Sequence, residues 1–243
     1  MLKKTVVTII LCHFAIGFVS ITPAWPGQNI STMITDPGHG GEDVGIVIAQ
    51  NYKEKDLSLK LSQRLKVLIE RNWHIECHLT RYGDHNPSIS ERVSFANNHQ
   101  GDLFVSLHFA EPEKAVAGEI MVYYYASPDN VLEESKKVDS PDKHFIPWKG
   151  TQINHLNNSI LLAEQVRSAF HTSVQEGSPP ALGLPLAVLS GINSPAILIE
   201  ITGMSRARDE GKFKEETWLN LTAAKIVKGL GKYREIAGIS EEN

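Results

Sequence analysis

The chain is poor in cysteine and in aromatic residues, and it has no excess of positive charge. Two of its 243 residues are cysteine, 7% are aromatic, and the formal net charge is −4. A chain without a basic excess is not expected to bind nucleic acid or an anionic membrane surface. Its 18 glycines, 12 prolines and 42% hydrophobic residues exclude collagen-like, low-complexity and broadly disordered classes. One large folded domain is therefore expected.

Long apolar runs are also missing, except at the N-terminus. Two lysines precede an apolar run from Thr5 to Ile21, and small residues suited to cleavage follow. The run contains His13 and is shorter than the roughly 20 apolar residues that a membrane-spanning helix needs. We therefore predict a secretory signal peptide at residues 1–24, cleaved after Ala24, and an exported protein with no stable membrane insertion after cleavage.

Cleavage leaves Cys77 as the only cysteine of the exported chain. Cys12 lies within the leader and follows Leu11, which is larger than the small residue typical of that position in lipoprotein signals. Lipidation of Cys12 is therefore not expected. No intramolecular disulfide can then form, so the fold depends on its core or on a metal. Cys77 lies between Ile75 and Leu79 in a strand-like segment, which is typical of a buried, unreactive thiol.

Apolar patterning predicts strands that alternate with helices. Strands are expected over residues 31–36, 74–80, 102–109, 118–125, 186–189 and 196–201, and helices over 54–71, 159–173, 211–233 and a short stretch capped by Ser88 or Ser90. Residues 126–156 scatter prolines among acids and lysines, which indicates a surface insertion. We predict a single α/β domain at 25–243, with a mostly parallel twisted sheet of about six strands and helices on both faces.

Polar side chains mark the ends of three predicted strands. His39 follows the first strand, His108 ends the third, and Glu200 lies near the end of a late apolar strand. The loops at the carboxyl edge of an α/β sheet converge, and Glu54, which opens the first helix, can reach the same edge. Two imidazoles and one carboxylate are the ligands of a zinc site with an open fourth position. Glu200 is left as a candidate base.

Each of these residues also has an explanation without a metal. His39 fits a turn in a glycine-rich loop, the helix dipole favours Glu54 at a helix start, and His108 fits a hydrogen-bonded core histidine. Glu200 is harder to explain structurally, because a carboxylate in an apolar strand is costly unless it is paired or protonated.

A second group of candidate ligands lies on one predicted strand. His74, Glu76 and His78 alternate along the chain, so their side chains share one face of the strand. The opposite face is apolar, which is typical of any strand with one solvent-exposed face. This strand-face group is the alternative metal site.

An ordered series of short motifs carries a family resemblance. The sequence reads DPGHGG at 36–41, followed by Asp43 and Gly45, EKDL at 54–57, Thr80-Arg81, Glu91-Arg92, FVSLH at 104–108 and PAILIE at 195–200. The series spans about residues 31–235 and resembles the zinc-dependent N-acetylmuramoyl-L-alanine amidases of bacterial cell-wall turnover.

The resemblance implies a site and a substrate. It implies that His39, Glu54 and His108 bind Zn²⁺ and that Glu200 is the catalytic acid and base. The implied substrate is peptidoglycan, cut at the amide between the lactyl group of N-acetylmuramic acid and the first L-alanine of the stem peptide. The signal peptide agrees with this, because peptidoglycan lies outside the cytoplasm. We expect a monomer in the periplasm or the cell wall.

Two departures from the family pattern flank the implied site. The chain has Phe109-Ala110 where the family usually has Ala-Asn, and 201–204 read ITGM where Gly-Phe is usual. These changes spare the ligands but put the stem-peptide preference in question. A zinc peptidase that cuts within the stem peptide and a catalytically weak wall-binding protein are the alternative functions.

Two further charged residues near these motifs are assigned supporting roles. Asp36 is expected to brace the His39 loop as a carboxylate beside a ligand histidine. Arg81 is expected to form an ion pair at a strand end, to orient a carboxylate or to touch the stem peptide.

Overall fold

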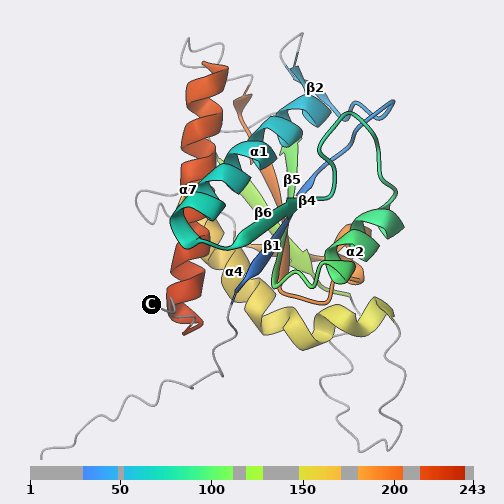
Figure 1. Ribbon diagram of the computed structural model, residues 1–243, viewed down its shortest axis with the longest axis vertical. Helices are drawn as coiled ribbons and strands as arrows, with labels where there is room; N and C mark the ends of the chain where they lie inside the picture. Colours follow the sequence, from blue (N-terminus) through green and yellow to red (C-terminus); the bar gives the residue numbers. More distant parts are fainter. Residues whose placement is uncertain are drawn as a thin grey trace, which may run out of the picture.

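The computed structural model describes residues 30–48, 52–111, 119–127, 148–170, 180–204 and 214–238. These residues form three layers, in which a six-stranded sheet lies between two layers of helices (Figure 1). The strands of this sheet are β1 (Thr32–Pro37), β4 (Glu76–Leu79), β5 (Leu103–Ala110), β6 (Ile120–Tyr125), β7 (Leu182–Leu184) and β8 (Ala196–Thr202). The helices are α1 (Glu54–Trp73), α2 (Ile89–Asn98), the 3₁₀ helix η2 (Trp148–His155), α4 (Leu156–Ser168), α5 (Ala187–Ser190) and α7 (Glu215–Ile236). The predicted signal peptide and residues 128–147 of the predicted insertion lie outside the described residues.

The sheet is mostly parallel, as predicted. Its strand order is β4-β1-β5-β8-β6-β7. Strand β1 pairs in parallel with β4 and β5, and β5 pairs in parallel with β8. Strand β6 runs antiparallel to β8, and β7 runs parallel to β6. The carboxyl ends of β1, β5 and β8 therefore lie at the same edge of the sheet.

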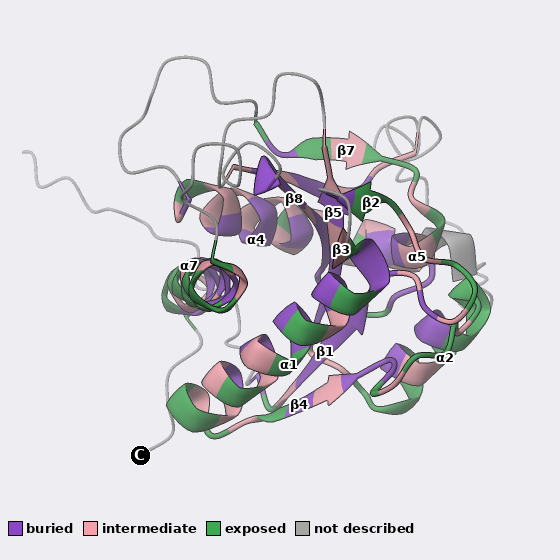
Figure 2. Cartoon of the chain, turned by 90° about the horizontal axis from the view of Figure 1, so that it is seen from above, coloured by how far each residue is buried: buried purple, intermediate pink, exposed green. Residues whose placement is uncertain are grey.

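Helices cover both faces of the sheet, as predicted (Figure 2). Helices α1, α4 and α7 pack on one face, where the regularly spaced leucines of α1, such as Leu57 and Leu61, are buried. Helices α2 and α5 pack on the other face, where Val93 and Leu189 belong to the same buried cluster as Ile34 and Phe104 of the sheet. The two clusters are separate cores divided by the sheet.

Two local predictions were wrong. His74 caps the C-terminus of α1 in the left-handed conformation, with φ 56°, so the following strand begins at Glu76 and not at residue 74. The segment 186–189, predicted to be a strand, instead contains α5, and the strand β7 precedes it. A run of four apolar residues fits either structure, since both bury one side.

The start of α2 follows the sequence closely. The hydroxyl of Ser88 accepts a hydrogen bond from the amide of Glu91, and the Glu91 carboxylate accepts one from the amide of Ser88. This reciprocal capping box selects Ser88 over Ser90 as the N-cap.

The end of the predicted insertion is tied to the domain. Residues 148–155 form η2, which leads directly into α4. The side chain of Gln152 is 1% exposed, and its amide donates to the carbonyls of Ile192 (2.5 Å) and Ser194 (2.7 Å). Gln152 is therefore buried with its amide satisfied by backbone acceptors, whereas the other residues from 151 to 156 are partly or fully exposed.

Strand β4 forms one edge of the sheet, and nearby side chains hydrogen-bond backbone groups on its unpaired side. The Cys77 amide donates to the Glu70 carboxylate (3.3 Å), and the Cys77 carbonyl accepts from Lys66 Nζ (2.5 Å). The Leu79 amide donates to the hydroxyl of Tyr82 (3.2 Å). The Cys77 side chain is fully buried, and burial raises the pKa of its thiol to about 11, so the prediction of a buried thiol is confirmed.

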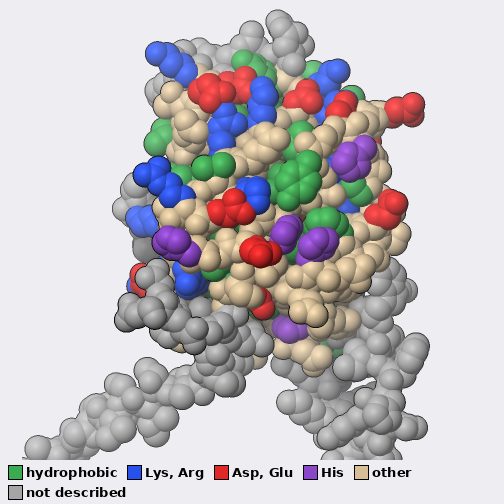
Figure 3. Space-filling view, viewed as in Figure 1, with side chains coloured by type: hydrophobic (Ala, Val, Ile, Leu, Met, Phe, Trp, Pro, Cys, Tyr) green, Lys and Arg blue, Asp and Glu red, His purple; other side chains and the backbone are tan. Residues whose placement is uncertain are grey.

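The surface seen in Figure 3 mixes acidic and basic side chains over α1 and its surroundings. Among the described residues, no helix has the length and apolar character that are needed to cross a bilayer.

Candidate metal centre

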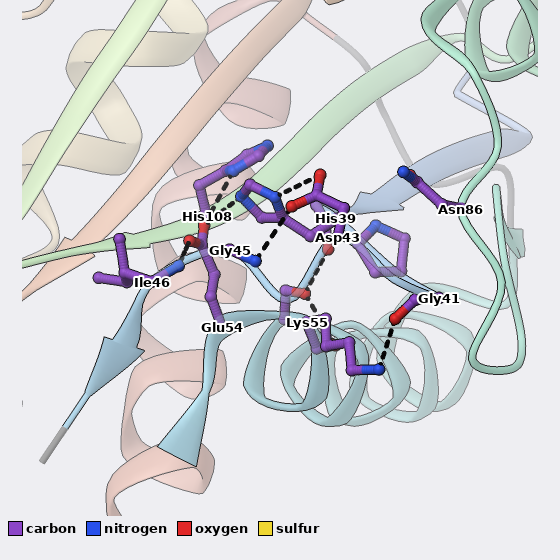
Figure 4. Close-up of polar contacts among 12 residues, drawn as sticks. His39, Gly41, Asp43, Gly45, Ile46, Glu54, Lys55, Asn86 and His108 are labelled. Atoms are coloured by element: carbon purple, nitrogen blue, oxygen red, sulfur yellow. Dashed lines mark hydrogen bonds and ion pairs between the residues drawn. The ribbon is translucent and has the colours of Figure 1, made fainter. Parts of the chain in front are cut away.

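Three elements bring the predicted ligands together. The chain turns directly after β1, where His39 adopts φ 60°. The His39 imidazole lies at the carboxyl edge of the sheet as a result of this turn. His108 lies near the end of the neighbouring strand β5, and Glu54 is the first residue of α1. Figure 4 shows the three side chains directed toward one another.

The carboxylate of Glu54 lies between the two imidazoles. Its Oε1 atom is 3.0 Å from His39 Nε2 and 3.0 Å from His108 Nδ1. The two rings meet edge to face, with centroids 5.0 Å apart. One ligand atom from each residue lies within 4.8 Å of the others, and in the described part of the chain this is the one such group of three.

Hydrogen bonds keep the Glu54 carboxylate ionised although it is 3% exposed. Burial raises the pKa of this carboxyl. Hydrogen bonds from His108, from His39 and from the amides of Ile46 and Phe109 lower the pKa by more than burial raises it, so the net shift is downward. The hydrogen bonds from the backbone amides of Ile46 and Phe109 are each 3.0 Å long, and each reaches a different oxygen of the carboxylate. A buried, negatively charged oxygen beside two imidazoles favours a cation at this position.

Asp43 orients the first imidazole. Its Oδ2 atom is 2.9 Å from His39 Nδ1, on the side of the ring opposite Glu54. The Glu54 hydrogen bond raises the pKa of His39, burial opposes this, and the Asp43 hydrogen bond raises it further. A carboxylate that accepts from one ring nitrogen leaves the other nitrogen directed at a metal. The sequence-based expectation assigned this partner role to Asp36, and Asp43 is the residue that contacts the ring.

The donor set fits a zinc ion. Tetrahedral zinc holds nitrogen and oxygen ligands at about 2.1 Å, which places those ligand atoms roughly 3.4 Å apart, close to the two 3.0 Å separations at Glu54. Glycines leave the room that this arrangement needs. A Cβ atom at Gly38 would lie 2.4 Å from His108 Cε1, and one at Gly45 would lie 2.5 Å from Glu54 Oε2. His39, Glu54 and His108 can therefore hold a metal ion.

Arg81 joins the two segments that carry ligands. Its guanidinium is 1% exposed and donates to the carbonyls of Gly38 (2.8 Å) and Lys55 (2.7 Å), the residues next to His39 and Glu54. Further bonds reach Ser58 Oγ and the carbonyls of Pro37 and Gly83. Among the described residues no carboxylate forms the expected ion pair with Arg81, and backbone oxygens satisfy the guanidinium instead.

Asp36 braces the same loop through Arg92. Its carboxylate accepts from Arg92 Nη1 (2.7 Å), Thr80 Oγ1 (2.5 Å) and Ser106 Oγ (2.8 Å). Arg92 then donates to the carbonyl of His39 (3.0 Å). The predicted bracing role of Asp36 is confirmed, with Arg92 as the connecting side chain.

Glu200 lies on the strand next to His108. The two residues are register partners in the parallel pair β5 and β8, so their side chains point to the same face of the sheet. Glu200 is partly exposed, and its Oε2 atom is 3.1 Å from the hydroxyl of Tyr123 on β6. The candidate base therefore lies beside His108, one of the three candidate metal ligands. Sequence reasoning missed Tyr123, since nothing in a strand-forming run of tyrosines tells which one meets Glu200.

A groove of about 400 Å³ opens at the imidazoles. Polar and apolar side chains both line it, and they include His39, Asp43, Asn86, Arg92, His108, Ile89, Leu186, Val188 and Leu198.

The alternative strand-face site does not assemble. His74 belongs to the end of α1, and His78 Nε2 contacts Glu76 Oε2 at 2.9 Å. These residues are not a group of three with ligand atoms within 4.8 Å in the described part of the chain.

The pattern of the N-acetylmuramoyl-L-alanine amidase family matches residues 33–232. The chain belongs to this amidase family. As a member, it is an enzyme of the amidase type, a hydrolase. The match includes all three candidate ligands and Glu200.

Individual amidases are similar over most of the chain. AmiC of Escherichia coli is 27% identical over 218 residues, which are 83% of this chain and 52% of AmiC. AmiA of Escherichia coli is 25% identical over 218 residues, which are 83% of this chain and 75% of AmiA. The chain thus spans about half the length of one relative and three quarters of the other.

Solved amidase structures share the fold. The amidase of Clostridium difficile superposes with a TM-score of 0.63 at 26% identity and covers 86% of this chain and 98% of its own. An amidase of Nostoc punctiforme superposes with a TM-score of 0.62 at 23% identity, covering 86% of this chain and 99% of its own. The predicted α/β architecture is therefore that of amidase catalytic domains.

Proposed function

We propose that this amidase hydrolyses the amide between N-acetylmuramic acid and L-alanine in peptidoglycan, with zinc held by His39, Glu54 and His108. The observation that carries the proposal is the convergence of these three ligands on one point, with Glu200 on the neighbouring strand. When bound, zinc supplies Lewis-acid polarisation of the scissile carbonyl and lowers the pKa of water.

The chain's own residues then move the proton. Glu200, anchored through one carboxylate oxygen, accepts a proton from the attacking water as the general base. It returns the proton to the alanine nitrogen as the amide bond breaks. The products are a free carboxyl on the lactyl group and a free amine on L-alanine.

Product chemistry tests the choice of bond. We expect mass spectrometry of a digested, defined muropeptide to show a new lactyl carboxyl and a new alanine amine. New ends within the stem peptide would support the peptidase alternative, and binding without new ends would support the wall-binding alternative. Either result overturns the proposal.

Substitution of Glu200 tests the base. The Glu200→Gln variant keeps nearly the same shape, so we expect zinc content and melting temperature to match the wild type. Turnover should fall by a factor on the order of 10² to 10⁴, the usual contribution of a general acid and base. Glu76→Gln, at the 75% exposed carboxylate of the alternative site, is the matched control and should keep full activity. A Glu200→Gln variant with near wild-type turnover would falsify the catalytic role.

The cellular setting is a proposal of the same kind. Residues 1–24 direct export, and the cleaved protein acts as a monomer in the periplasm or the cell wall. N-terminal sequencing of protein from the exported fraction should begin at Trp25, and size-exclusion chromatography with light scattering should give the monomer mass. An intact leader in the cytosol or a dimer mass would contradict the respective statement.

A further inference from the structure

Tyr123 and Glu200 are diagonal neighbours on adjacent strands. In the antiparallel pair β6 and β8, Tyr123 lies opposite Leu198, and Met121 lies opposite Glu200. Alternate residues of a strand share a face, so Met121, Tyr123 and Glu200 point to the same side of the sheet. His108 lies on this side too, because it is the register partner of Glu200 on β5. A diagonal tyrosine is long enough to reach across to its neighbour.

The hydroxyl of Tyr123 donates to Glu200. The oxygen atoms are 3.1 Å apart, and the tyrosine is 9% exposed. Burial and the Glu200 charge raise the pKa of Tyr123 to about 12, so the hydroxyl keeps its proton at neutral pH. Met121 Sδ lies 3.4 Å from the same hydroxyl. A hydroxyl has one proton, and a carboxylate is a stronger acceptor than a thioether.

The contact constrains one oxygen of the candidate base. It occupies Oε2, and within the described residues no second side chain hydrogen-bonds this carboxylate. An anchored Oε2 restricts rotation of the carboxylate plane, and Oε1 stays available to a water molecule. A base must hold such a geometry to take a proton efficiently.

We propose that Tyr123 is a positioning residue for the catalytic carboxylate: its hydroxyl holds Glu200 so that the second oxygen faces the attacking water. This inference rests on the proposed function, since it requires Glu200 to be the base. Tyr123 itself does not contact the reacting atoms. It acts on turnover through Glu200 and leaves substrate affinity and metal binding unaffected.

The Tyr123→Phe variant removes the hydroxyl and keeps the ring in the core. We expect kcat on a soluble muropeptide to fall about tenfold, the effect of losing a hydrogen bond to a charged group. KM, zinc content and melting temperature should stay at the wild-type values. Tyr125→Phe is the matched control, because Tyr125 is buried two residues further along the same face of β6. It should keep the wild-type kcat.

A double variant separates positioning from a general structural effect. If Tyr123 acts through Glu200, Tyr123→Phe causes no further loss in the Glu200→Gln background. An equal fractional loss in both backgrounds, or a Tyr123→Phe kcat within twofold of the wild type, overturns this inference alone. A Glu200→Gln variant with wild-type turnover overturns the proposed base and this inference together.

Discussion

Replacing Arg81 with methionine tests whether the guanidinium holds the metal centre together. The side chain donates five hydrogen bonds from a fully enclosed position. Two of its acceptors keep a second donor in the variant: Arg92 still donates to the carbonyl of Pro37, and the single proton of the Ser58 hydroxyl still serves the carbonyl of Gly38, its nearer acceptor at 2.8 Å. The Arg81→Met variant therefore loses charge-assisted hydrogen bonds but leaves few carbonyls without a hydrogen-bond donor.

The size of the effect follows from these bonds. A hydrogen bond from a charged donor contributes about 1.5 to 3 kcal/mol, and release of the buried charge to water offsets part of the sum, so we expect about 3 kcal/mol less unfolding free energy. At about 2 to 4 °C per kcal/mol for a domain of this size, the melting temperature should fall by roughly 6 to 12 °C. Calorimetry measures both quantities.

The second readout is zinc affinity, measured by chelator competition well below the melting temperature. Because Arg81 bonds the residues beside His39 and Glu54, the affinity of Arg81→Met should fall on the order of tenfold, as for other outer partners of metal ligands. Arg81→Lys should also lose affinity, since an ammonium lacks the planar fork. Arg71→Met, at an exposed arginine of α1, is the control and should change neither quantity. A lower melting temperature with wild-type zinc affinity would show that Arg81 stabilises the fold without positioning ligands.

Three other substitutions or reactions test separate features. Asp43→Ala removes the carboxylate beside Nδ1 of His39 and should weaken zinc binding by about 10- to 100-fold in a chelator titration; an unchanged affinity would refute its orienting role. Gly38→Ala would place a methyl group 2.4 Å from the second imidazole and should abolish stoichiometric zinc in elemental analysis, whereas Gly231→Ala, whose Cβ would have its nearest neighbour at 3.7 Å, should bind zinc normally. Cys77 should react with an aromatic disulfide reagent only after unfolding, because its thiol is buried and its pKa is about 11; rapid labelling of the native protein would contradict the packing described.

The ligand positions could be predicted because they depend on a general property of α/β sheets. His39 and His108 follow apolar strands, and the carboxyl ends of parallel strands meet at one edge. Glu54 opens a helix whose leucine spacing is unambiguous. Neither feature requires knowledge of strand order.

The supporting residues could not be predicted in the same way. The acceptors of Arg81 are backbone carbonyls, which every residue has, so no sequence pattern marks them. The contact between Tyr123 and Glu200 depends on the antiparallel register of β6 against β8, and this register could not be predicted from the sequence pattern. The turn that brings Asp43 back to His39 requires positive φ at His39, Gly40 and Gly41, a conformation that the sequence allows but does not specify.

The side chains on the free edge of β4 have a consequence for self-association. A sheet edge with unpaired amides and carbonyls is a template on which a second chain can add a strand and begin to aggregate. Lys66, Glu70 and Tyr82 already bond the amide and carbonyl of Cys77 and the amide of Leu79, so an incoming strand has to displace them first. These three side chains therefore protect the edge of β4 against pairing with a second chain.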